Sequence, residues 1–78
     1  MVTMLADLDN DMALHTALAQ GWVVEPPVYA MTDALRRDRR VLQFILWRDG
    51  RPRVVTVDDT PEVRGWIDAQ GWTVAVLR

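Results

Sequence analysis

The chain of 78 residues contains no cysteine, no serine and no lysine, and its only histidine is His15. Without cysteine it can form neither a disulfide nor a thiolate metal site. The usual serine and cysteine nucleophiles and a Schiff-base lysine are also missing. The four glycines stand apart at positions 21, 50, 65 and 71, so there is no glycine-rich phosphate loop. We therefore expect a non-catalytic protein without a cofactor or a metal ion, although acid or metal chemistry through aspartates stays open.

Long hydrophobic runs are also missing. No apolar stretch approaches the roughly 18 residues that a membrane-spanning helix needs. The first residues lack the basic start and the sustained apolar run of a signal peptide. The formal net charge of -2 gives no general attraction to nucleic acids or anionic membranes. By elimination, we expect a soluble cytoplasmic protein that does not bind a membrane.

The length and the apolar content predict one small folded domain over residues 1–78. Half of the residues are hydrophobic and four are tryptophan, which is too rich for a disordered chain. A chain this short buries only roughly 60% of its unfolded surface, so its stability is thin. Small folds often gain support from disulfides, metals or oligomerisation. With no cysteine available, oligomerisation is the support that we expect.

The strongest local signal is a β-hairpin over residues 41–58. Two runs rich in β-branched and aromatic residues flank Asp49-Gly50, a pair that favours a two-residue hairpin turn. In that register Arg48 pairs with Arg51. Because side chains alternate between the two faces of a strand, one face is almost purely apolar and is the expected core. Its members are Leu42, Phe44, Leu46, Val55 and Val57.

The other face of this hairpin is mixed but carries four large apolar side chains, Val41, Ile45, Trp47 and Val54. If the face is open, they form a hydrophobic patch, which we expect Arg48 and Arg51 to rim. Such patches usually mark interaction sites, and Trp and Arg are favoured at their centres. We therefore predict a protein interface there, most simply with a second copy of the chain. The alternatives are that the N-terminal segment or the strand with Pro26-Pro27 covers the face, or that the two faces are inverted.

Two helices are predicted on either side of the hairpin, over residues 11–20 and 61–70. The second has a clear start, with Thr60 as the N-cap and Pro61 in the first helical position. Arg64 and Asp68 on it are expected to form an exposed pair. Gly65 weakens this helix and would permit close packing on the sheet.

The remaining segments are consistent with more than one structure. Residues 2–7 form either a short strand or an early helical turn. Residues 22–31 are extended, but Pro26-Pro27 makes them an edge strand, a bulged strand or two short pieces. Thr32-Asp33 either caps a short helical turn over 34–37 or begins a loop. Residues 72–77 form the last strand. The order (β)-α-β-β-β-α-β predicts an α+β fold: a two-layer sandwich with a mainly antiparallel sheet of four to five strands and two helices on one face.

Two charged segments suggest other functions. Asp7, Asp9 and Asp11 match the start of a calcium loop, but Met12 and Leu18 stand where that loop needs Gly and Glu, so we interpret them as helix-start acids. The second segment is the arginine-rich run 36–40.

In this run Arg36, Arg37, Arg39 and Arg40 are candidates for binding an anion or nucleic acid. They lie roughly 26 Å of strand away from Arg48, so one subunit cannot merge the two basic groups. Double-stranded-RNA-binding domains have a similar element order, but they carry basic residues where this chain has Thr60-Pro61-Glu62. Nucleic-acid binding is therefore the alternative, not the favoured prediction.

Overall fold

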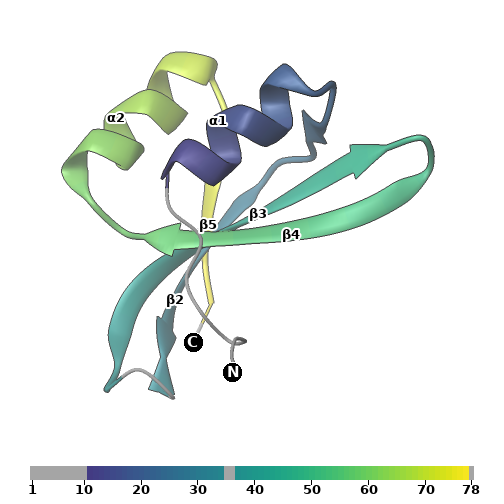
Figure 1. Cartoon of the computed structure of the whole chain (residues 1–78). Coiled ribbons are helices and arrows are strands. Elements are labelled where there is room, and N and C mark those ends of the chain that lie inside the picture. The colour runs from purple at the N-terminus through teal and green to yellow at the C-terminus, as the bar shows by residue number, and fades with distance from the viewer. Residues whose placement is uncertain (1–10, 35–36, 78) are drawn as a thin grey trace.

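The computed structural model describes residues 11–34 and 37–77. Within these ranges the chain forms two helices and one mixed, open sheet of five strands. In Figure 1 both helices lie on the same side of the sheet, so the predicted two-layer α+β sandwich is confirmed. The elements are, in order, α1 (Asp11–Ala19), β1 (Val23–Val24), β2 (Val28–Asp33), β3 (Arg39–Arg48), β4 (Arg51–Asp58), α2 (Pro61–Gln70) and β5 (Val74–Val76).

The β3–β4 hairpin has the predicted register. Arg48 pairs with Arg51, and the ladder continues without interruption to Val41 opposite Asp58. Asp49 and Gly50 both have positive φ, at 52° and 73°, as a type I′ turn requires. The Asp-Gly pair therefore fixes which side chains share each face of the hairpin.

The core lies between the helices and the face of the hairpin predicted to be buried. All five side chains predicted for that face are 0% exposed. Phe44 sits at the centre of an aromatic cluster, with Trp66 at 6.1 Å and Trp72 at 6.4 Å between ring centroids. The buried core cluster consists of Leu14, Ala17, Val24, Val28, Ala30, Leu42, Phe44, Leu46, Val55, Val57, Val63 and Ile67.

The Pro-Pro segment divides one extended stretch into two short strands, β1 and β2, which was one of the predicted alternatives. Because β4 pairs with β3 all the way from Val41 to Arg48, β1 and β2 must share the opposite edge of β3. Val24 faces Leu46 and Tyr29 faces Gln43. The chain therefore advances five residues from Val24 to Tyr29, while the facing part of β3 advances only three. The two extra residues are accommodated in the segment that contains the prolines, where a continuous ladder is interrupted.

The helix α2 connects two parallel strands of the sheet. The predicted crossover from β4 leads to β5, which pairs in parallel with β2 rather than with β4 itself. Thr60 caps the start of α2, since its side-chain oxygen accepts a hydrogen bond of 3.2 Å from the backbone N–H of Val63. At its other end Gly71 takes the left-handed conformation, at φ 79°. Val63 and Ile67 form the buried stripe of this helix.

Three local predictions need correction or lie beyond the described residues. Thr32 and Asp33 continue β2 instead of capping a helical turn, because they pair with the first residues of β3. Part of the proposed turn over 34–37 falls on residues outside the described ranges, as does the segment 2–7. A Cβ added to Gly65 would meet nothing within 4 Å, so this glycine does not mark a close approach to the sheet.

Candidate functional site

An apolar strip lies on the sheet face that the helices leave uncovered, at the turn end of the hairpin. Cross-strand partners share a face, so the pairs of Trp47 with Pro52 and with Val23 form one row across β4, β3 and β1. The next row holds Val54 opposite Ile45. Val23 is 65% exposed, Val54 54% and Trp47 37%, while Ile45 is half-buried. The apolar strip consists of these five residues: Val23, Ile45, Trp47, Pro52 and Val54.

Val41, the fourth side chain predicted for the interface, lies outside this strip. It is only 1% exposed. Its ladder partners on either side are Met31 and Asp58, and Asp58 is ion-paired with Arg39, which lies two residues before Val41 on the same face. Val41 is thus enclosed at the end of β3 that is remote from the turn.

Val23 was not singled out from the sequence. Its place in the strip follows from the pairing of β1 with β3, which involves only two residues of β1. A two-residue strand has no periodicity that a pattern could detect. The one available signal was the β-branched pair Val23-Val24 before the prolines.

The arginines near the turn lie on the other face of the hairpin. Alternation along the ladder puts Arg48, Arg51 and Arg53 on the helix side. The prediction that Arg48 and Arg51 rim the apolar patch is therefore wrong. There Trp22 packs against the core, and the guanidinium of Arg53 lies 5.8 Å from its ring centroid. Figure 1 shows this end of the hairpin reaching beyond the helices. The hairpin end is therefore two-sided, apolar on one face and basic on the other.

The arginine-rich segment is divided by its contacts. Arg36 lies outside the described residues, and Arg37 is exposed with a positive φ of 56°. Arg39 binds Asp58 through contacts of 2.6 and 2.8 Å. Arg40 lies 3.9 Å from the carboxylate of Asp59. Two of the four candidate arginines thus face a carboxylate of the same chain, which lowers the positive charge that they offer to a ligand.

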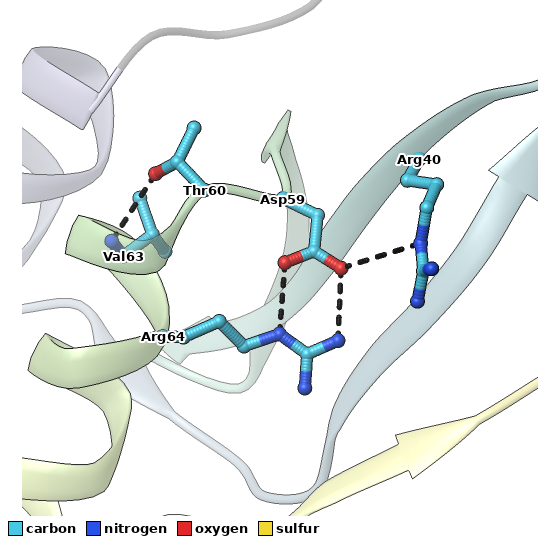
Figure 2. Close-up of polar contacts among 5 residues, drawn as sticks. All are labelled: Arg40, Asp59, Thr60, Val63 and Arg64. Carbon is cyan, nitrogen blue, oxygen red and sulfur yellow. Dashed lines mark hydrogen bonds and ion pairs between the residues drawn. The ribbon is translucent and has the colours of Figure 1, made fainter.

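Asp59 is the centre of the polar contacts in Figure 2. Its side chain is only 10% exposed, and the carboxylate accepts two hydrogen bonds of 2.8 Å from Arg64 in the first turn of α2. These bonds hold the pKa of Asp59 below its ordinary value; the charges of Arg64 and Arg40 lower it further, while partial burial opposes them. The same contact raises the pKa of Arg64. The predicted pair of Arg64 with Asp68 is replaced by this one, which ties α2 to the end of β4.

His15 lines a hollow of about 170 Å³ between the two helices, together with Leu14, Glu62, Val63 and Trp66. Its ring meets the ring of Trp66 edge-on, at 5.0 Å between centroids. The chain supplies no serine, cysteine or lysine to act as a nucleophile beside this histidine. The contact with Trp66 gives His15 a packing role.

The described ranges 11–34 and 37–77 contain no cluster of three or more His, Cys, Asp or Glu side chains that could hold a metal ion. In the same part of the chain, neither helix is long and apolar enough to cross a membrane.

Comparisons of the chain with models of protein families, with curated protein sequences and with solved structures found no match.

Proposed function

We propose that this protein is a non-catalytic interaction module that forms a homodimer through the apolar strip. The observation that carries the proposal is the exposure of Val23, Trp47 and Val54 in neighbouring rows of one sheet face. Single exposed apolar residues are ordinary, but a contiguous group of them is typical of an interaction site. Tryptophan is also one of the residue types enriched among those that dominate binding energy.

A second copy of the chain is the partner that the strip suits best. In a two-fold dimer the same patch contributes from both subunits, so a patch must be compatible with itself. None of the five residues of the strip carries a charge, and the neighbouring arginines project from the other face. Two strips can therefore meet without bringing like charges together.

The size of the face sets the expected strength of the dimer. Ten residues of β3 extend about 33 Å and four neighbouring strands about 19 Å, so the whole uncovered sheet face has a flat area of at most roughly 600 Å². The apolar strip is only the part of this face nearest the turn. A standard interface buries about 800 Å² per partner. An interface centred on the strip is well below that size and should dissociate on dilution, so we expect a dimer that depends on protein concentration.

Sedimentation equilibrium over a series of concentrations tests the proposal. The wild-type mass should rise with concentration from the 8.9 kDa of one chain toward twice that value. Trp47→Ala should remain at the mass of one chain under conditions where the wild type dimerises. Met12→Ala is the matched control, because Met12 is a 70% exposed apolar side chain on the helical layer; it should dimerise like the wild type.

Circular dichroism shows whether each variant is folded. Trp47 is partly exposed and lies outside the buried core cluster, so its loss should leave the monomer folded. A folded Trp47→Ala protein with the same mass profile as the wild type would disprove the strip as the interface. A wild-type mass that stays at one chain throughout would disprove the dimer.

Binding of an anion or nucleic acid by Arg36, Arg37, Arg39 and Arg40 is the weaker proposal. The ion pairs of Arg39 and Arg40 with Asp58 and Asp59 favour a structural role for these two arginines. Binding through this segment would weaken steeply with added salt, whereas association through an apolar strip persists.

A further inference from the structure

A second candidate site lies on the helix side of the hairpin end. Here a hollow of about 340 Å³ is lined by Trp22, Arg48, Asp49 and Arg51. We propose that it binds a phosphate monoester attached to an aromatic base, as in a nucleoside monophosphate or the 5′-phosphorylated end of a nucleic-acid strand. The site is on the face opposite to the apolar strip, so this proposal does not rest on dimer formation.

The first argument is an accumulation of positive charge. Arg48 and Arg51 are direct cross-strand partners, and Arg53 follows two residues later on the same face. Like charges placed opposite each other destabilise a sheet. Asp49 is 3.7 Å from Arg48, but its side chain is 86% exposed, so this pair offers little compensation. A bound anion would relieve the repulsion between the arginines.

The balance of charge favours a phosphate monoester over a single carboxylate. The hollow is lined by two arginines and one aspartate, and Arg53 lies beside it over Trp22, so this end of the hairpin has a local surplus of two positive charges. A phosphate monoester carries about -1.5 to -2 charge at neutral pH, which matches that surplus. The planar guanidinium group can also donate two parallel hydrogen bonds to phosphate oxygens.

The aromatic wall of the hollow favours a base beside the phosphate. Trp22 is half-buried and packs against the core, which holds its ring in place. Arg53 lies against this ring at 5.8 Å from the centroid. Aromatic and guanidinium surfaces are those on which nucleic-acid bases stack. The volume lies within the range of small-ligand pockets, about 300–1,000 Å³.

Isothermal titration with adenosine monophosphate tests the proposal. The wild type should bind adenosine monophosphate saturably. On binding, the indole N–H signal of Trp22 should shift in NMR spectra of the protein. The double variant R48Q/R51Q should bind about tenfold more weakly or worse, because each charge-assisted hydrogen bond contributes substantially. M12E/Q70E changes the net charge by the same amount at two exposed positions on the helices and should bind like the wild type.

Two further ligands identify the chemistry that is recognised. Adenosine without its phosphate should bind far more weakly than adenosine monophosphate. If the site recognises strand ends, a short oligothymidylate with a 5′-phosphate should bind more tightly than the same strand without the phosphate. If it recognises free nucleotides, the two strands should bind equally. Absence of saturable binding by the wild type, equal weakening in both double variants, or equal affinity for adenosine would each overturn the proposal.

Discussion

Replacing Asp59 with asparagine should destabilise the fold by about 2 kcal/mol. An exposed ion pair contributes at most about 1 kcal/mol, whereas breaking a buried pair costs about 3–5 kcal/mol. The side chain of Asp59 is 10% exposed and that of Arg64 37%, so their pair lies between these limits. For a domain of this size, a loss of 2 kcal/mol lowers the melting temperature by roughly 8–16 °C. Thermal and urea denaturation both measure the effect.

The dependence of this loss on pH identifies its cause. The folded-state pKa of Asp59 is lowered, so its charge stabilises the fold above the ordinary carboxyl pKa. That stabilisation disappears as the pH falls through the lowered folded-state value. The difference in unfolding free energy between wild type and Asp59→Asn should therefore be greatest near neutral pH and shrink below about pH 4.

Asp68→Asn is the matched control for the change of charge. Asp68 lies exposed on α2, so its replacement should alter stability by no more than about 0.5 kcal/mol. Equal losses for the two variants would refute the assignment of stability to the contact between Asp59 and Arg64. A loss that stays constant into acid would refute its attribution to the charged carboxylate.

Two further substitutions test the packing and the helix start. Phe44→Ala should cost about 3–5 kcal/mol in urea denaturation, because Phe44 is fully buried against Trp66 and Trp72; a loss below about 1 kcal/mol would contradict the aromatic core. Thr60→Ala should cost about 1 kcal/mol, since it removes the acceptor for the N–H of Val63; a melting temperature equal to that of the wild type would contradict the cap.

The sequence predicted the hairpin and its buried face because both depend on local signals. Asp49-Gly50 selects the turn, and alternation then assigns every side chain of β3 and β4 to a face. The start of α2 was predictable for the same reason, since Thr60 and Pro61 are local signals for an N-cap and a first helical turn. Elements of this kind need no knowledge of distant contacts.

The surface features depend on distant contacts and were predicted only in part. Trp47 and Val54 could be assigned to one face by alternation, but Val23 joins them only through the pairing of β1 with β3. The burial of Val41 and the ion pair of Arg64 with Asp59 likewise depend on residues from separate parts of the chain. Spacing along one helix favoured Asp68 as the partner, but it does not show that the end of β4 lies within reach.

The role of the apolar strip is tested most directly by amide NMR spectra of the wild-type protein at increasing concentration. We predict concentration-dependent shifts for Val23, Trp47 and Val54, with the signals of Met12 on the helical layer unchanged. Such a pattern would show both that the protein self-associates and which face it uses. Shifts confined to the helices, or spectra that do not change with concentration, would contradict association through this face of the sheet.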